Sequence, residues 1–476
     1  MSARYITTTL PYVNSDPHIG FALEIVQADA LARSWRLAED EVFFSTGADE
    51  HGQKIHDAAE KAGQGTQAYV DRYVSEFQKM KKALDLSTDT FIRTTDPEHI
   101  KAVQEMWSRC DAAGDIYKKS YSGLYCVGCE SFKTEKELVD GKCPLHPNLV
   151  PEKISEENYF FRFSNYQEKL LEYLERPGTL VPEWRRAEAI AFVKNGLEDF
   201  SISREKKRLS WGVPVPGDDT QIMYVWFDAL TNYISTLGWP EDANGKFKKF
   251  WEEGTTLQVA GKDQVRFQSL MWQAMLMSAK IKTTDTVFYH GFITSGGQKM
   301  SKSLGNVISP LDLVEKYGTD AVRYILLRHV SPDDDSDLTL ETIHNLYTDN
   351  LVNGLGNLVA RVMKLAEQYL QNPIEKPNIE PTYPAEITRY IQEFRFNEAL
   401  DFIWAYIQKE DQNITEQEPF KVVKENEQKG AHMIYEFVQE LYLIAHFLIP
   451  FMPKTSEIIL KAIQENKKPE NLFPRI

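Results

Sequence analysis

Several features of secreted and membrane proteins are missing from this sequence. Only four of its 476 residues are cysteine, and no internal repeat or low-complexity tract occurs. The most apolar run, Leu441–Met452, is short and contains His446 and Pro450, so it predicts a buried helix rather than a membrane span. The N-terminus leads directly into strand-like sequence and has no signal-peptide pattern. These absences exclude secreted and membrane-spanning classes and predict a cytoplasmic location.

An excess of basic residues is also absent. The chain has 54 Lys and Arg against 70 Asp and Glu, which gives a formal net charge of −16. This balance excludes indiscriminate binding of nucleic acid, although a structured RNA could still bind a local basic patch. With 42% hydrophobic and 26% charged residues, the composition is that of a globular protein long enough for two or three domains.

Strand-like and helix-like segments alternate in the first part of the chain. The expected strands are Tyr5–Leu10 and Glu41–Ser45, and the expected helices are His18–Leu37 and Gln53–Lys61. This order predicts a Rossmann-type α/β fold, a doubly wound parallel sheet whose ligands lie beyond the carboxyl ends of its strands. The loops that follow the first two strands should therefore share one rim of the sheet.

The alternation breaks from residue 116 to about 200, which predicts an insertion with its own small core. It then resumes with helices at Val225–Leu237 and Val265–Ala279 and strands at Leu257–Ala260 and Val287–Thr294. From about Leu338 onward only helical patterns occur, which predicts a helix bundle. The expected domains are a first catalytic half at 1–115, the insertion at 116–200, a second catalytic half at 201–307, a junction at 308–340 and a helical domain at 341–476.

Two loops have the composition of phosphate-binding segments. In the first, Pro17-His18-Ile19-Gly20 opens a helix, whose free N–H groups suit a phosphate, while His18 can donate a hydrogen bond. In the second, the turn Gly296-Gly297 precedes Lys299-Met-Ser-Lys-Ser303, whose two lysines suit a clamp on phosphates. Taken singly, the first loop is better explained as an ordinary helix end and the second as a solvated surface loop.

The cysteines are grouped in a way that predicts a metal site. Cys126 and Cys129 form one short pair, and Cys143 and His146 form a second after residues 130 to 142. Three thiolates and one imidazole meet the tetrahedral requirement of zinc and fill all four positions, which indicates one structural Zn²⁺. Cys110 lies outside this pattern and is expected in the core. The alternative is three unrelated thiols.

Two further segments are candidates for substrate binding. Asp49, in Gly47–Gly52 at the end of the second strand, could hold a substrate ammonium group, or it could be a helix N-cap. Trp226, Ala229 and Tyr233 share one face of a predicted helix, which could line a pocket or could belong to the core.

The two phosphate-binding motifs, in this order and in this strand–loop context, resemble the HIGH and KMSKS signatures of class I aminoacyl-tRNA synthetases. The resemblance covers almost the whole chain and is greatest to the methionyl-tRNA synthetases, through Thr8–Asn14, Gly47–Gln53, Val225–Ala229, Gly261–Asp263 and the cysteine-bearing insertion. It implies a methionine–tRNA ligase. Such an enzyme forms methionyl-adenylate and pyrophosphate from L-methionine and Mg²⁺-ATP, then transfers methionine to the 3′-terminal ribose of tRNA(Met).

The resemblance also assigns site residues. Those implied to surround methionine are Leu10, Tyr12, Asp49, Trp226, Ala229, Leu230, Tyr233, Gln268 and Trp272. Those implied to contact ATP are His18, Gly20, Phe21, Glu24, Gly261, Asp263, Lys299, Ser301 and Lys302. Those implied to act in catalysis are His18, Arg204, Lys299 and Lys302. Those implied to read the anticodon are Asn357, Arg361 and Phe420.

Three positions depart from the family pattern. Phe21 stands where the first signature has its second histidine, so His18 and the two lysines would carry more of the transition-state charge. Gln268 stands where a pocket histidine is usual, and its amide can still donate a hydrogen bond. Phe420 stands where a tryptophan usually stacks on an anticodon base, and it offers a smaller stacking face. None of these changes removes an indispensable charge.

Two other interpretations are open. The chain could be another class I synthetase, for cysteine or a branched aliphatic amino acid, but the insertion is short for an editing domain and the metal ligands lie within it. It could instead be an inactive RNA-binding relative, which the retained His18, Asp49, Lys299 and Lys302 argue against. Because the chain ends soon after the helical region, without a further C-terminal domain, a monomer is expected.

Overall fold

The computed structural model describes residues 2–127, 131–133, 135–144, 146, 148–300, 306–370, 374, 377 and 379–476, apart from the side chains of Tyr121, Ser131, Phe132, Lys136, Ile154 and Lys299. These residues form two compact units. The first unit comprises Met1–Asp16, Asp40–Lys79 and Thr88–Tyr289. The second comprises Pro17–Glu39, Met80–Ser87 and His290–Ile476.

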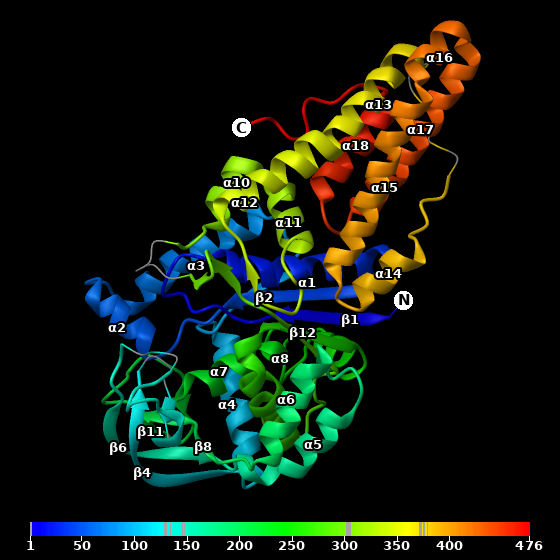
Figure 1. The fold of residues 1–476 in the computed structure, drawn as a ribbon. Helices are drawn as coiled ribbons and strands as arrows, with labels where there is room; N and C mark the ends of the chain where they lie inside the picture. The colour runs from blue at the N-terminus through cyan, green and yellow to red at the C-terminus, as the bar shows by residue number, and fades with distance from the viewer. Residues whose placement is uncertain are drawn as a thin grey trace. The chain divides into compact units, whose positions relative to one another are not determined.

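A six-stranded sheet organises the first unit (Figure 1). Its order is β3 (Thr90–Arg93), β2 (Glu41–Ala48), β1 (Ala3–Thr8), β12 (Thr255–Gly261), β13 (Thr286–His290) and β7 (Leu180–Val181). The strand β1 pairs in parallel with β2 and with β12, and β2 pairs in parallel with β3. The predicted Rossmann-type parallel sheet is therefore confirmed.

The strand order identifies the edge of the sheet at which ligands are expected. From β1 the chain proceeds to β2 and β3 on one side, and it returns on the other side with β12 and β13. The order therefore reverses between β1 and β12, and in doubly wound sheets this switch point marks the binding crevice. The loops after β1, β2 and β12 all leave the sheet at this carboxyl edge, as the sequence predicts.

Most helices of the first unit contribute to one continuous hydrophobic core. The helices of this unit are α2 (Gln53–Lys61), α3 (Thr66–Ala83), α4 (Pro97–Ala112), α5 (Gln167–Glu175), α6 (Glu183–Lys194), α7 (Val225–Leu230), α8 (Asn232–Ser235) and α9 (Trp272–Ser278). The single helix expected over Val225–Leu237 is divided into α7 and α8. The interruption is at Thr231, whose hydroxyl donates to the carbonyl of Phe227 at 3.1 Å. Such back-bonding disturbs a regular helix.

The insertion combines antiparallel strands with the helices α5 and α6. Its strands β5 (Ser131–Lys133), β4 (Ile116–Cys126) and β6 (Glu152–Phe161) form one sheet with β8 (Phe200–Ser201). A second sheet, of β10 (Pro214–Val215), β11 (Asp218–Met223) and β9 (Ser203–Glu205), follows the insertion in the chain. The expectation of a separate small core is wrong. Phe161 and Phe163 belong to the same buried cluster as Tyr5 and Phe43 of the central sheet, because strand β6 leads directly into the hydrophobic interior.

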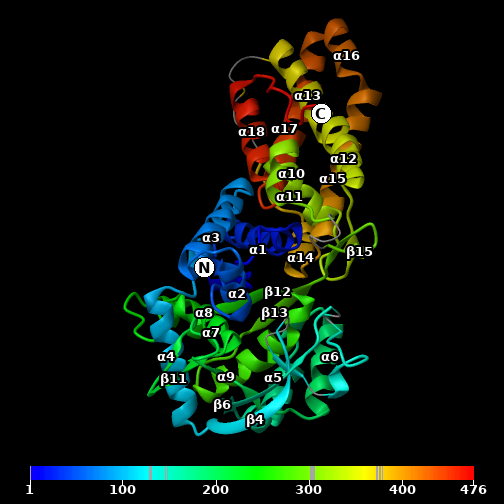
Figure 2. The ribbon, with the colours of Figure 1, turned by 90° about the vertical axis from the view of Figure 1, so that its left-hand side faces the viewer.

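The second unit is mostly helical, as the sequence predicts. Its helices are α1 (Ile19–Leu37), α10 (Pro310–Tyr317), α11 (Thr319–Arg328), α12 (Leu340–Leu346), α13 (Gly356–Tyr369), α14 (Ala385–Gln392), α15 (Phe396–Gln417), α16 (Pro419–Glu425), α17 (Glu427–Leu448) and α18 (Pro453–Glu465). Figures 1 and 2 show α13, α15, α17 and α18 running side by side in one bundle. Within the described part of the chain, no helix combines the length and apolar character that crossing a membrane requires.

A glycine hairpin precedes the second phosphate-binding motif. The strands β14 (Ile293–Ser295) and β15 (Gln298–Lys299) are antiparallel and are joined by Gly296 and Gly297, whose φ angles are 63° and 71°. Positive φ at both central residues defines the turn type that favours glycine, so the predicted tight turn is confirmed. A short strand, β16 (Ser336–Asp337), pairs with the other side of β14.

The strand expected over Val287–Thr294 is interrupted at Gly291. A Cβ atom at this position would lie 2.0 Å from the carbonyl oxygen of Asp334. The backbone of Gly291 therefore packs directly against another backbone, and only glycine permits that approach. As a result β13 ends at His290 and β14 begins at Ile293.

A fully buried ion pair connects α1 to the helical bundle inside the second unit. Arg323 on α11 donates to the carboxylate of Asp29 on α1 at 2.7 Å, and neither side chain is exposed. The same guanidinium donates to the carbonyl oxygens of Leu84, Pro450 and Phe451 at 3.2, 3.0 and 2.8 Å. One side chain thus holds α11, the loop after α3 and the turn between α17 and α18.

This ion pair predicts a specific loss of stability in acid. Burial alone would raise the pKa of Asp29, but Arg323, Arg33 and Ser87 outweigh it and hold that pKa below its ordinary value. The resulting stability is present above a pH of about 4 and is lost as pH falls through the lower folded pKa. In Asp29→Asn we expect a free energy of unfolding about 3–5 kcal/mol lower at pH 7, with a weaker further loss in acid. Urea unfolding midpoints at pH 7, 5, 4 and 3 measure this, and parallel pH profiles for both proteins would contradict it.

Candidate active site and metal cluster

The loop after β1 is fixed against the end of β2 in the first unit. The amide of Asp49 donates to the carbonyl of Pro11 at 3.0 Å, and the amide of Val13 donates to the carbonyl of Asp49 at 3.2 Å. Tyr12 and Asp49 thereby form an isolated parallel bridge that extends the sheet. The side chain of Asp49 is 2% exposed. The alternative role of Asp49 as an N-cap is excluded, because Gly52 occupies that position of α2.

An aromatic wall stands beside this loop. Trp226 on α7 stacks on Phe267, with ring centroids 3.9 Å apart and an angle of 13° between the ring planes. Tyr12 meets the edge of Trp226 at 6.5 Å. The sequence analysis missed Phe267, although its position next to Gln268 is a signal that could have indicated it. Tyr12 and Trp226 are therefore brought together as predicted, with Phe267 as an additional member.

Gln268 and Tyr233 form a buried hydrogen-bonded pair in the same unit. The side-chain amide of Gln268, which is 1% exposed, donates to the hydroxyl of Tyr233 at 3.0 Å. The ring of Tyr233 packs against Trp272, with ring centroids 5.8 Å apart. Ala229 and Leu230 are also buried on α7. All nine residues implied to surround methionine lie in the first unit.

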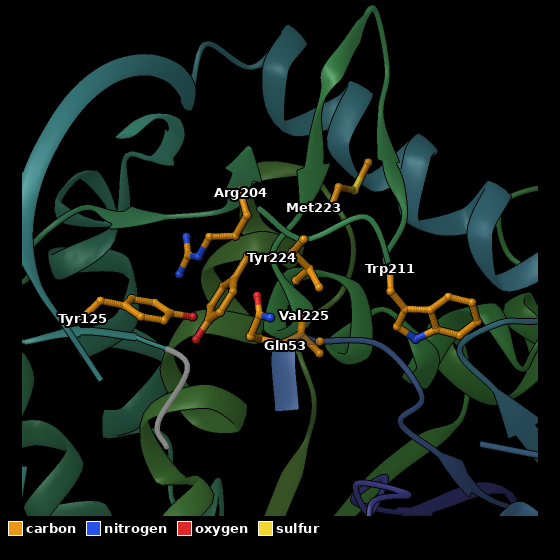
Figure 3. Close-up of a pocket in the computed structure, with 9 residues that line it drawn as sticks. Gln53, Tyr125, Arg204, Trp211, Met223, Tyr224 and Val225 are labelled. Atoms are coloured by element: carbon orange, nitrogen blue, oxygen red, sulfur yellow. The ribbon is translucent and has the colours of Figure 1, made fainter. Parts of the chain in front are cut away.

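Arg204 lines a cavity in the first unit (Figure 3). Its guanidinium donates to the hydroxyl of Ser201 at 2.8 Å and lies over the rings of Tyr224 and Tyr125, at 4.6 and 5.3 Å. Burial opposes its charge, but the two tyrosines and Glu156 outweigh this effect and hold the pKa of Arg204 above its ordinary value. The other lining residues are Gly52, Gln53, Leu209, Trp211, Met223 and Val225.

A buried carboxylate that the sequence analysis did not single out lies on the same helix as Trp226. Asp228 on α7 contacts His51 Nδ1 through Oδ2 at 2.6 Å and His99 Nε2 through Oδ1 at 2.8 Å. The three residues come from α7, the loop after β2 and α4. Only the fold brings them together, so no local pattern could have indicated the cluster.

Two of the residues implied to contact ATP follow β12 in the first unit. Gly261 ends the strand and precedes a short 3₁₀ turn over Lys262–Gln264. Asp263 is exposed in that turn and accepts a hydrogen bond from the side-chain amide of Gln264 at 3.0 Å. Both residues therefore lie on the carboxyl edge of the sheet.

His18 is the N-cap of α1 in the second unit, as its sequence context predicts. Its Nδ1 atom accepts a hydrogen bond from the amide of Gly20 at 3.1 Å. A neutral imidazole that accepts at Nδ1 carries its proton on Nε2, which makes Nε2 the donor atom. A Cβ atom at Gly20 would lie 3.0 Å from two atoms of the His18 ring, so glycine leaves the ring room in this position.

The next turn of α1 holds two further candidates. Phe21 is buried, with 8% of its surface exposed. Glu24 is also buried, and its carboxylate lies 3.0 Å from His290 Nε2, while His290 Nδ1 donates to the carbonyl of Gly291 at 2.7 Å. Glu24 therefore connects α1 to the start of the segment that leads to the lysine motif. The backbone of Lys299 lies in β15, whereas its side chain, Ser301 and Lys302 are outside the described residues.

The three residues implied to read an anticodon lie on the bundle. Asn357 and Arg361 are one turn apart on α13, and Phe420 on α16 is 36% exposed. The guanidinium of Arg361 donates to the carboxylate of Asp411 at 2.6 Å and to the hydroxyl of Thr415 at 3.0 Å, both on α15. These contacts fix the direction of Arg361 in the free protein.

Three of the four predicted metal ligands come together in the insertion. The sulfur atoms of Cys126 and Cys143 each lie 3.9 Å from His146 Nδ1, and the three ligand atoms are all within 4.8 Å of one another. Sulfur and nitrogen on one tetrahedral zinc ion are roughly 3.6 Å apart, as zinc–ligand bond lengths require. The three residues therefore fit a metal ion, and Cys129 lies outside the described residues.

Comparison with known proteins agrees with this architecture. A family model described as tRNA synthetases class I (M) matches residues 4–149 and 147–363. This match, together with the switch point of the parallel sheet, defines a class I tRNA synthetase. A methionine–tRNA ligase of Caldanaerobacter subterraneus subsp. tengcongensis is 39% identical over 99% of this chain and 78% of its own length. One from Synechocystis sp. is 39% identical over 96% of this chain and 89% of its own length.

Solved structures give the same assignment. A Mycobacterium tuberculosis methionyl-tRNA synthetase in complex with methionyl-adenylate is similar, with a TM-score of 0.91, 36% identity and full coverage of both chains. A structure of the same enzyme in its free state gives a TM-score of 0.84 at 32% identity, covering 100% of this chain and 98% of that one. The chain belongs to the methionine–tRNA ligase family.

Proposed function

We propose that this protein activates L-methionine with ATP and transfers it to tRNA(Met) as a methionine–tRNA ligase. The observation that carries the proposal is the group of Asp49, Tyr12 and Trp226 at the carboxyl edge of the sheet. A buried carboxylate beside an aromatic wall suits an amino acid that has a positive ammonium group and an unbranched apolar side chain. The family membership makes methionine the expected amino acid.

The first chemical step joins two anions. A carboxylate oxygen of methionine attacks the α-phosphorus of ATP, an oxygen–phosphorus bond forms, and pyrophosphate leaves with the electron pair of the bond that breaks. Because the nucleophile is already ionised, the barrier lies in bringing the anions together and in the charge that develops on the phosphates. We propose that His18, Arg204, Lys299 and Lys302 lower this barrier, and that Mg²⁺ enters with ATP and neutralises part of the phosphate charge.

The other residues that we propose to contact ATP are named separately for each unit. In the first unit they are Gly261 and Asp263, and in the second unit they are Gly20, Phe21, Glu24 and Ser301.

In the second step a ribose hydroxyl at the 3′ end of tRNA, the 2′-hydroxyl in class I chemistry, attacks the carbonyl carbon of the adenylate. The ester bond forms and AMP leaves. We propose Asn357, Arg361 and Phe420 as the residues that read the anticodon.

Selection of methionine must rest mainly on shape, because one methylene group in an apolar pocket is worth only about 1–3 kcal/mol. We propose that Gln268 adds a polar element. Its side-chain amide donates to the hydroxyl of Tyr233, a second residue proposed to contact methionine, at 3.0 Å. A thioether sulfur is a weak acceptor for amide or hydroxyl donors, whereas an all-carbon side chain offers no acceptor.

ATP–pyrophosphate exchange with each amino acid in turn tests the proposed function. We expect exchange with methionine and little with cysteine, leucine, isoleucine or valine. Exchange with another amino acid but not with methionine would indicate a different class I synthetase. The absence of exchange with any amino acid, together with retained tRNA binding, would indicate an inactive RNA-binding relative.

We propose one structural zinc ion at Cys126, Cys129, Cys143 and His146. Zinc in small lobes of this kind stabilises the folded state by roughly 10 kcal/mol or more, comparable to the stability of a whole domain. The donor set of thiolates and an imidazole suits zinc better than magnesium or calcium. The metal would hold the ends of β4 and the following loops, and no chemical step passes through it.

Removal of one ligand should release the metal. In Cys143→Ser we expect a large loss of zinc, measured by elemental analysis of freshly purified protein, together with faster proteolysis of the insertion. The matched control is Cys110→Ala, because Cys110 is fully buried and burial raises the pKa of its thiol to about 12. Full zinc content in Cys143→Ser, or none in the unmodified protein, would contradict the proposal.

Three further properties are proposed from the family and from the sequence. The first is a cytoplasmic location, which suits cysteines that act as reduced metal ligands. The second is a monomeric state. The third is a division into domains at 1–115, 116–200, 201–307, 308–340 and 341–476. Sedimentation of the purified protein tests the monomer, and limited proteolysis tests the boundaries.

A further inference from the structure

Asp228 is a fully enclosed carboxylate whose two oxygen atoms are shared between two imidazole rings. It is 1% exposed, and its contacts with His51 and His99 are 2.6 and 2.8 Å long. Burial alone would raise the pKa of Asp228, but the two histidines outweigh it and hold that pKa below its ordinary value. An ionised carboxylate in this position is a strong, rigid acceptor for both rings.

The two histidines link Asp228 to segments that carry candidate methionine residues. His51 is two positions after Asp49, in the loop that follows β2. His99 belongs to α4, and its Nδ1 atom is 2.8 Å from the hydroxyl of Ser235 on α8, the helix that also carries Tyr233. Figure 1 shows α4, α7 and α8 close together beneath the sheet. One carboxylate therefore connects the segment of Asp49 to α7 and α8, the two helices that carry Trp226 and Tyr233.

The other side of the same loop is also held firmly. Arg93 donates to both carboxylate oxygens of Glu50, at 2.5 and 2.8 Å, and Thr95 donates to one of them at 2.8 Å. The indole of Trp211 donates to the carbonyl of Glu50 at 2.6 Å, and its ring meets His51 edge-on at 5.5 Å. With Glu50 fixed to β3, the loop depends on Asp228 for its distance from α7.

We propose that Asp228 is a positioning residue for methionine, which sets the spacing between Asp49 and the face of α7 that carries Trp226 and Ala229. Because Asp228 is buried, its effect passes through His51, His99 and α7. The inference rests on the proposed function, since it concerns the same amino-acid site. A site that must hold an ammonium group and a side chain simultaneously loses affinity when its two walls shift by a fraction of an ångström.

The test is Asp228→Asn, in which the amide has nearly the same shape but can accept from only one of the two rings. In ATP–pyrophosphate exchange we expect KM for methionine to rise about tenfold or more, while KM for ATP and kcat change by less than about threefold. Equilibrium dialysis with methionine alone should show the same loss of affinity without any reaction. A purely structural role would change the melting temperature but not this split between the two KM values.

Asp115→Asn is the matched control. Asp115 is a second buried carboxylate in the same unit, accepts from Tyr166 and from Ser278 at 2.7 Å, and contacts the end of α9 opposite Trp272. We expect a similar loss of thermal stability with an unchanged KM for methionine. If Asp228→Asn and Asp115→Asn have the same KM for methionine, the proposal is overturned.

If Asp228→Asn does not fold, a second pair of variants tests whether Asp228 positions the methionine site. His99→Gln keeps a donor near the position of Nε2, whereas His99→Leu removes it. We expect a near-normal methionine affinity in the first variant and a weaker one in the second, and equal affinities would overturn the proposal. An unmodified protein that neither binds nor activates methionine would instead refute the proposed function, so the two failures are distinguishable.

Discussion

Asp49→Asn is expected to lower kcat/KM for methionine by about 10²- to 10³-fold, mainly through KM. The asparagine keeps the shape of the side chain and the backbone bonds to Pro11 and Val13, but it removes the negative charge. A buried, hydrogen-bonded charge pair of the kind expected with the methionine ammonium group is worth about 2–5 kcal/mol when one partner is neutralised. ATP–pyrophosphate exchange over a range of methionine concentrations measures the effect.

Asp40→Asn is a suitable control for this change. Asp40 also lies next to β2, but it is at the opposite end, where it pairs with Arg4 at 2.7 Å. We expect its KM for methionine to stay within about twofold of the unmodified value, because Asp40 precedes β2 and so lies away from the carboxyl edge where Asp49 follows the strand. An Asp49→Asn variant that behaves like this control would show that Asp49 does not bind the ammonium group.

His18→Ala is expected to slow methionyl-adenylate formation by about 10²- to 10³-fold, the usual cost of removing one donor that acts on developing charge. Because Nδ1 accepts from Gly20, the Nε2–H group is the donor that the imidazole presents. The effect should fall on the rate and not on the affinity for methionine. A burst of methionyl-adenylate in rapid-quench experiments measures the rate, and equilibrium dialysis measures the affinity.

Two further variants separate this role from a role in the structure of the helix. His18→Gln retains a donor near the position of Nε2, so we expect it to recover part of the rate. Gly20→Ala keeps the imidazole but brings a Cβ atom to within 3.0 Å of its ring, and we expect an intermediate loss. Equal losses of rate and of methionine affinity in His18→Ala would refute a role in the transition state.

Local patterns predicted much of the fold. The alternation of short apolar runs and helical periods placed β1, β2, α1 and α2 close to their observed bounds, because each depends on residues near one another in the chain. The turn at Gly296 and Gly297 was predictable for the same reason, since only its own backbone angles matter. The break at Gly291 was not, because it results from contact with the distant backbone of Asp334.

The candidate site likewise has features that the sequence predicted and features that only distant contacts in the fold reveal. The sequence by itself predicted the two phosphate motifs, the family they resemble and the four candidate metal ligands, since these rest on residue types at fixed spacing. Only the tertiary structure decided that Phe267 stacks on Trp226 and that Asp228 joins His51 to His99, which are 177 and 129 positions away. The physical reason is that packing and buried hydrogen bonds depend on which surfaces the fold brings together, and a linear pattern does not encode those contacts.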